Sequence, residues 1–146
     1  MNSQQADFYQ SLRGEVRDWL KSVDGSTSKA AEYLMFAPDL FHLLCKLSID
    51  QDVPIAEKLK LAAAIAYFIS PVDLIPGFAF GPLGYVDDIA LAAYALNSII
   101  KNSGPAIVQK HWAGEGDVLE VIQATLEFAN RTLGGGFLKK IEQVFR

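Results

Sequence analysis

Apolar side chains recur every three or four residues along most of the chain, with polar and charged residues between them. Near the start this spacing places one stripe on a helix over about residues 5–23, made of Phe8, Leu12, Val16, Trp19, Leu20 and Val23. No stretch shows sustained alternation of apolar and polar residues, so no strand is predicted. The pattern predicts an all-α protein, a single irregular bundle of about six or seven helices.

Turn-forming residues divide this pattern into separate helices. After the first helix, the breaks predict a second one ending near Met35, then helices over 38–48, 53–69, 87–101, 105–112 and 117–132. The helix over 53–69 carries six residues on one side, and its small members would allow a neighbour to approach closely: Ile55, Leu59, Ala62, Ala63, Ala66 and Ile69. The two later helices carry their own stripes: Ile89, Ala92, Ala93, Leu96, Ile99 and Ile100, then Val118, Val121, Ile122, Thr125, Leu126 and Ala129.

Three consecutive glycines, Gly134–Gly136, predict a stop or a flexible joint near the end of the chain. The tail over 137–146 then forms a helix whose apolar face is Phe137, Ile141, Val144 and Phe145. We expect this tail to be a movable part of one domain over residues 1–146, and these four residues to be its interaction contacts.

Composition narrows the classes of function. The chain of 146 residues has a formal net charge of −4, and no Lys/Arg cluster is larger than Lys139-Lys140, so nucleic acid is not an expected partner. Its single cysteine, Cys45, forms no disulfide within the chain and is predicted to be a small core residue. The first residues lack the basic and apolar regions of a secretory signal, so the cytoplasm is the expected location.

The runs of residues that contain no Asp, Glu, Lys or Arg are too short for a membrane span. They contain 12, 13 and 12 residues, over 61–72, 74–86 and 89–100. A spanning helix needs about 18–20 apolar residues. A re-entrant hairpin, or one that lies on the membrane surface and is peripheral to the inner membrane, remains open.

Familiar catalytic and cofactor-binding motifs are missing, so no catalytic residue is assigned. Trp112 is predicted to anchor a short helix in the core, with His111 half-exposed beside it. The unusual segment is 68-FISPVDLIPGFAFGPLGYVDD-88. No Lys or Arg occurs from Leu61 to Ile100, and the formal charges there are Asp73, Asp87 and Asp88.

Carboxylates in such an apolar setting need hydrogen bonds, ion pairs or a cation. Ser70 as N-cap, Pro71 and Asp73 fit one helix start, and Gly84 followed by Asp87 and Asp88 fits another. Alternatively, if the flanking helices form an antiparallel hairpin, Asp73, Asp87 and Asp88 lie at the same end and suit Mg²⁺, Ca²⁺ or Mn²⁺. A third interpretation pairs one of them with Arg13, Arg17 or Lys58. The segment's apolar residues either plug the end of the bundle or form an exposed patch.

This segment resembles the signature of the YkvA-like family, a bacterial domain of unknown function. The matching residues are Tyr67, Ser70, Pro71, Asp73, Leu74, Ile75, Pro76, Gly84, Tyr85, Asp87 and Asp88, within a resemblance over about residues 50–100. Gly77 stands where the family usually has another Asp, which weakens the cation hypothesis. The resemblance implies a small helical domain with no settled enzymatic activity, and some relatives are treated as membrane-associated.

Together these patterns favour a small non-enzymatic helical protein that binds a partner protein, a second copy of itself or a membrane surface. The alternative is a divalent-cation-binding enzyme or sensor that uses Asp73, Asp87 and Asp88. No other cofactor is expected.

Overall fold

The computed structural model of the chain describes residues 2–21, 31–69 and 86–144, of which 31, 32, 86, 87 and 132–144 are described by their backbone. All regular structure in these ranges is α-helical, which confirms the all-α prediction. The helices are α1 (Ser3–Lys21), α3 (Ala31–Leu34), α4 (Ala37–Ser48), α5 (Ile55–Ile69), α7 (Val86–Ser103), α8 (Ala106–His111) and α9 (Val118–Val144).

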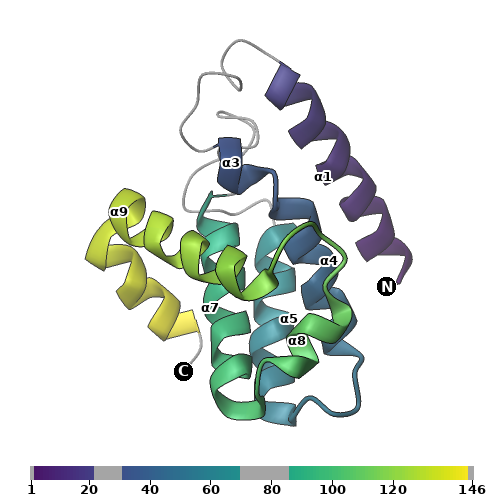
Figure 1. Cartoon of the computed structure of the whole chain (residues 1–146), viewed down its shortest axis with the longest axis vertical. Helices are drawn as coiled ribbons and strands as arrows, with labels where there is room; N and C mark the ends of the chain where they lie inside the picture. The colour runs from purple at the N-terminus through teal and green to yellow at the C-terminus, as the bar shows by residue number, and fades with distance from the viewer. Residues whose placement is uncertain (1, 22–30, 70–85, 145–146) are drawn as a thin grey trace.

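Three helices form the centre of the bundle. α4, α5 and α7 lie side by side, and α5 and α7 run in opposite directions, as the antiparallel alternative required (Figure 1). α1 packs across α4 on one side, while α9 packs against α7 on the other. α8 joins α7 to α9 and contacts α4.

An aromatic cluster joins α1, α4 and α5. The Phe8 and Phe41 ring centroids lie 4.8 Å apart, and those of Phe41 and Phe68 lie 5.6 Å apart, both edge to face. Edge-to-face pairs stabilise a core beyond the area they bury. This cluster fixes which side of α5 faces inward, because Phe68 belongs to that helix.

The predicted stripes of three helices face the core. On α1, Leu12 and Val16 are buried. The stripe of α7 is buried except for the half-buried Ile100, and that of α9 is buried except for the half-buried Leu126. Cys45 is also buried, as predicted.

Glycine ends α7 as its sequence indicates. The Gly104 N–H donates to the Ile100 carbonyl at 3.0 Å, and Gly104 has φ of +87°. This left-handed conformation is common just beyond a helix end and favours glycine, which has no Cβ to clash.

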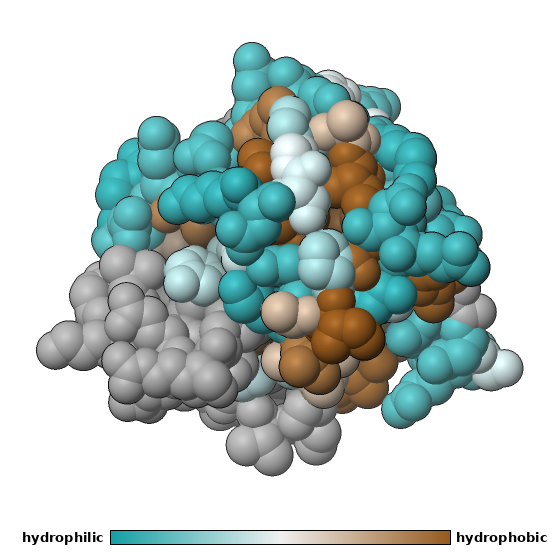
Figure 2. Space-filling model, turned by 90° about the horizontal axis from the view of Figure 1, so that it is seen from below, coloured by the Kyte–Doolittle hydropathy of each residue, from teal (hydrophilic) through white to brown (hydrophobic). Residues whose placement is uncertain are grey.

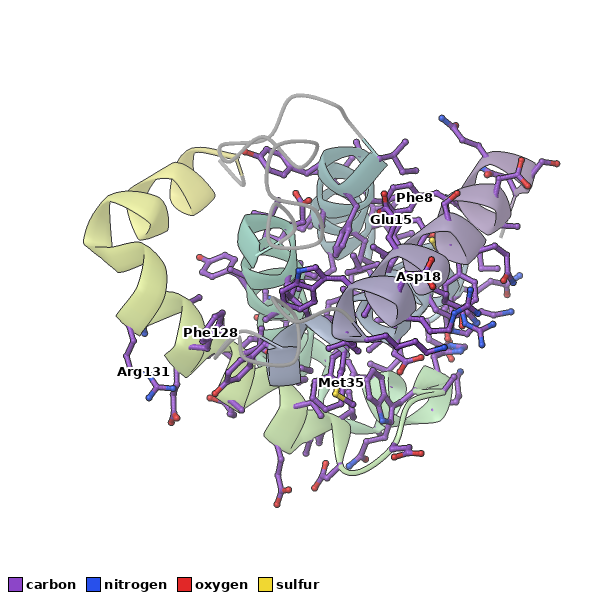
Figure 3. The ribbon with its side chains drawn as sticks, turned by 90° about the horizontal axis from the view of Figure 1, so that it is seen from above. Phe8, Glu15, Asp18, Met35, Phe128 and Arg131 are labelled. Carbon is purple, nitrogen blue, oxygen red and sulfur yellow. The ribbon has the colours of Figure 1, made fainter. Side chains whose placement is uncertain are left out.

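The predicted stop at Gly134–Gly136 is wrong, because α9 continues through these residues to Val144. Its ribbon changes direction beyond Arg131 (Figures 1 and 3). Glycine costs a helix about 1 kcal/mol per residue relative to alanine, so neighbouring turns can carry it, and such sites often bend. Phe137, Ile141 and Val144 therefore belong to α9, while Phe145 lies outside the described residues.

The first half of α9 is held by contacts with α3. The Tyr33 and Phe128 rings stack with centroids 4.1 Å apart, and Arg131 Nη2 donates to the Tyr33 hydroxyl at 3.5 Å. Phe128 and Arg131 both precede the change of direction (Figure 3). None of the helices in the described ranges combines the length and apolar character needed to cross a membrane.

Candidate interaction surface

Most of the predicted structural signature lies outside the described residues. This applies to Ser70, Pro71, Asp73, Pro76, Gly84 and Tyr85, whose roles stay predictions. Asp87 and Asp88 are the second and third residues of α7, as the helix-start interpretation predicted. The Asp88 side chain is completely buried. Within the described residues no group of three or more His, Cys, Asp or Glu side chains is placed to hold a metal, and the cation hypothesis stays untested.

The described residues instead reveal an apolar surface on α5. Ile55 is 75% exposed and Leu59 is 69% exposed, whereas Glu57 between them is 4% exposed. Ala62 and Ala66 are exposed on the same side. We call Ile55, Leu59, Ala62 and Ala66 the outer stripe. Four of the six residues that the sequence grouped on this helix thus face solvent, while Ala63 and Ile69 are half-buried.

The reason is that α5 has a second apolar side. Leu61, Ala64, Ile65 and Phe68 are buried, and the helix packs through them between α4 and α7. Larger side chains and the aromatic cluster make this side the inner one. Large exposed apolar residues that gather on one surface mark interaction sites more often than scattered ones do. A view of the molecule from below shows apolar residues reaching the surface between polar ones (Figure 2).

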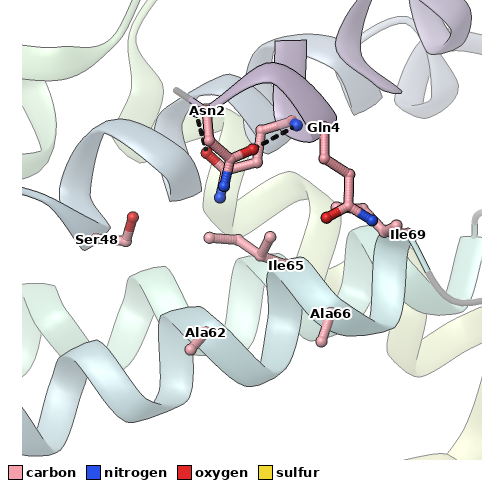
Figure 4. Close-up of a pocket in the computed structure, with 8 residues that line it drawn as sticks. Asn2, Gln4, Ser48, Ala62, Ile65, Ala66 and Ile69 are labelled. Carbon is pink, nitrogen blue, oxygen red and sulfur yellow. Dashed lines mark hydrogen bonds between the residues drawn. The ribbon is translucent and has the colours of Figure 1, made fainter. Parts of the chain in front are cut away.

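A groove of about 580 Å³ includes Ala62 and Ala66 of the outer stripe (Figure 4). Its apolar floor comes from α5, and its polar edge comes from the start of α1 and the end of α4: Ala62, Ile65, Ala66 and Ile69, then Asn2, Gln4, Gln5 and Ser48. Asn2 and Gln5 fix this edge, because each backbone N–H donates to the other's side-chain oxygen, at 3.2 and 2.8 Å. We call it the amide groove. The described residues that line it carry no charged side chain.

Two of the three charged side chains of α5, Glu57 and Lys60, turn toward α7, and the third, Lys58, is half-buried. Glu57 Oε1 accepts from Asn102 Nδ2 at 2.7 Å and lies 3.5 Å from Lys60 Nζ. Lys60 Nζ also donates to Ser98 Oγ at 2.8 Å. The second oxygen of Glu57 has no hydrogen-bond partner among the described residues. Sequence reasoning missed this network, and the spacing of Glu57 and Lys60, three residues apart, was the available signal.

A charged cluster fastens α8 to the turn before α5. Asp50 Oδ2 lies 2.5 Å from His111 Nε2 and 3.0 Å from Lys110 Nζ. These contacts, the His111 hydrogen bond first, hold the pKa of the Asp50 carboxyl well below its usual range. His111 is partly exposed as predicted, but it makes a specific contact that the sequence did not indicate. Trp112 packs against the core, and its Nε1 donates to the Gly116 carbonyl at 3.2 Å.

A second groove, of about 650 Å³, runs along α1 and brings three cations together. Arg13, Arg17 and Lys21 line it with Asp39 on its wall. The sequence shows these cations four residues apart, a helical spacing that counting consecutive Lys and Arg residues overlooks. Burial raises the pKa of the Asp39 carboxyl.

Comparisons with known proteins give a domain and one relative, neither with an assigned activity. Residues 57–94 match a family model described as "Protein of unknown function (DUF1232)". The match begins at Glu57 and lies within the region of resemblance expected from the sequence, but it does not confirm the YkvA-like name. The chain is 26% identical over 125 residues to "Uncharacterized protein ORF9" of Methanothermobacter thermautotrophicus, covering 84% of each protein. No solved structure matches.

Proposed function

We propose that this chain is a non-enzymatic helical protein that acts by docking a partner protein on the outer stripe of α5. The observation that carries the proposal is the reversed pattern of that helix. Ile55 and Leu59 are 75% and 69% exposed, while Glu57 is 4% exposed and turned toward α7. A helix serving only the core would present the opposite arrangement.

The free energy available at this surface is large enough to matter for binding. Burying an Ile or Leu side chain completely gives about 1.5–3 kcal/mol, so covering the exposed parts of these two residues gives about 2–4 kcal/mol. Interfaces commonly have an apolar centre surrounded by a polar rim. The amide groove supplies such an edge.

Charge favours a protein over a lipid surface. Helices that lie in a membrane interface carry Lys and Arg on their polar face, which adds attraction to anionic lipids. Lys60 is instead tied to Glu57 and Ser98, Lys58 is half-buried, and the chain carries a net charge of −4. An acidic protein gains no long-range attraction to an anionic membrane.

Photo-crosslinking in intact cells tests the proposal. Leu59→benzoylphenylalanine places a reactive group on the outer stripe, and Gln10→benzoylphenylalanine is the control on the exposed side of α1. We expect protein adducts at position 59 that are absent at position 10 and lost when Ile55→Lys is added. The same adducts at both positions, or flotation with liposomes that depends on Leu59, would contradict the proposal.

A further inference from the structure

We infer that the partner docked on the outer stripe is a second copy of this chain, bound through antiparallel packing of α5 against α5. This inference rests on the proposed function and names its partner. Three features support it: the spacing of the stripe, the order of its side-chain sizes and its lack of charge.

The spacing is that of a helix–helix seam. The outer stripe residues are separated by four, three and four positions, which is the a/d repeat of two helices that pack along their length. From Ile55 to Ala66 the stripe is about 17 Å long at about 1.5 Å per residue. It thus offers a helical partner three full turns of contact.

The order of sizes then selects the antiparallel arrangement. The two large residues, Ile55 and Leu59, come first and the two alanines follow. In an antiparallel pair, Ile55 lies opposite Ala66 of the second copy, and Leu59 lies opposite Ala62 of the second copy. Two-fold symmetry repeats both layers, so all four layers combine one large and one small side chain.

A parallel pair has no such complementarity. It would place Ile55 opposite Ile55 and Leu59 opposite Leu59, and would leave alanines facing alanines at the other end. The helices would be held apart at one end and leave a gap at the other, which loses packing contacts. The stripe is therefore complementary to itself only when the second copy is reversed.

Charge and shape at the edge agree with this arrangement. Two copies that each carry a net charge of −4 can approach through the outer stripe because it contains no charged residue. Ile55 of the second copy, opposite Ala66, comes against the amide groove, where the lining residues that the structure describes are also uncharged. Stable interfaces bury more than about 1,000 Å² in total, so the amide edge must add to the helix contact. We expect a reversible dimer whose population rises with concentration.

Disulfide trapping tests the register directly. Leu59→Cys and Ala62→Cys chains of different tag length are purified separately, mixed and oxidised mildly. The antiparallel pair brings these two positions together, and a disulfide needs Cα atoms about 4.4–6.8 Å apart. We expect the disulfide-linked dimer of a Leu59→Cys chain with an Ala62→Cys chain to form several-fold more than the disulfide-linked dimer of either variant alone. Cys45 does not interfere, because burial raises the pKa of its thiol to about 11. A mixture of Gln10→Cys and Leu59→Cys chains is the control, and it measures how much disulfide forms through random collision.

A change of side-chain size distinguishes this specific pairing from nonspecific hydrophobic association. Ala62→Leu makes the stripe more apolar but places leucine against leucine, so we expect the sedimentation-measured dissociation constant to rise at least tenfold with an unchanged circular dichroism spectrum. Tighter association of Ala62→Leu, or efficient trapping of Leu59→Cys alone, overturns the antiparallel pair. If the chain is monomeric at every concentration measured and position 59 crosslinks to another protein, this inference is overturned and the proposed function stands. No adduct at position 59 overturns both.

Discussion

The orientation of α5 can be tested with two leucines that lie two residues apart. Leu61 is completely buried, whereas Leu59 is 69% exposed. Leu61→Ala and Leu59→Ala remove the same atoms from the same helix, and alanine suits both positions as a helix former. Any difference in their effects therefore reports which side of α5 faces the core.

The magnitudes follow from the two exposures. Leu→Ala at a fully buried position costs about 2–5 kcal/mol, because the transfer of the side chain and the cavity left behind both count. The buried third of Leu59 is worth about 0.5–1 kcal/mol on the scale of about 1.5–3 kcal/mol for a whole side chain. For a chain of this size, we expect the unfolding midpoint to fall by about 5–20 °C for Leu61→Ala and by less than about 4 °C for Leu59→Ala.

Urea unfolding followed by far-ultraviolet circular dichroism measures both free energies of unfolding, provided that the slope with urea is the same for each variant. The protein is kept at low micromolar concentration so that association does not contribute. If Leu59→Ala costs as much as Leu61→Ala under these conditions, the outer stripe packs inside the chain and the reasoning about α5 is refuted. A cost at Leu59 that grows with protein concentration would instead report the dimer.

Three further predictions concern the buried and charged groups. Burial raises the pKa of the Cys45 thiol to about 11, so a thiol reagent at pH 8 should modify it only after urea unfolding, and rapid labelling of the folded chain would contradict its burial. In the folded chain the Asp50 carboxyl has a pKa below its unfolded value of about 4, mainly because of its contact with His111. Its contribution to the free energy of unfolding is therefore fully present above about pH 4 and is lost as the pH falls through the folded pKa. Asp50→Asn should therefore lower the urea midpoint at pH 7 more than at pH 3, and an equal effect at both would argue against the charged contact. Asn102→Ala removes the 2.7 Å donor to a buried carboxylate of α5 and should cost about 1–3 kcal/mol, against less than about 0.5 kcal/mol for the exposed Asn130→Ala, and equal costs would show that the contact is unimportant.

The sequence was most informative where a helix has one apolar side. α9 carries a single strong stripe, and that stripe faces the core. α5 carries two, and periodicity alone gives no reason to prefer Leu61 and Phe68 over Ile55 and Leu59. The prediction of a break at glycines 134–136 was wrong for a related reason. The helix propensity lost at these glycines was not enough to end a helix that continues on both sides of them.

For the candidate surface too, the sequence predicted which residues share a side of a helix but not which side is buried. The sequence placed Ile55, Leu59, Ala62 and Ala66 on one side of a helix, and it placed Asp87 and Asp88 at the start of another. It could not show that the first group faces solvent, because that depends on which residues of α1, α4 and α7 occupy the other side. Likewise, the contact between Asp50 and His111 joins residues far apart in the chain, which no local spacing reveals.

The sequence by itself thus determined the helical class, most helix ends and the apolar stripes of α7 and α9, because these depend on interactions within a few residues. Only the tertiary structure decided which of the two sides of α5 is buried, since that choice compares the packing of whole helices. Phe68 beside Phe41 and Phe8 satisfies one side, and Leu59 remains outside at 69% exposure. The function proposed for this chain depends on that choice, because a stripe turned inward would have nothing left to bind.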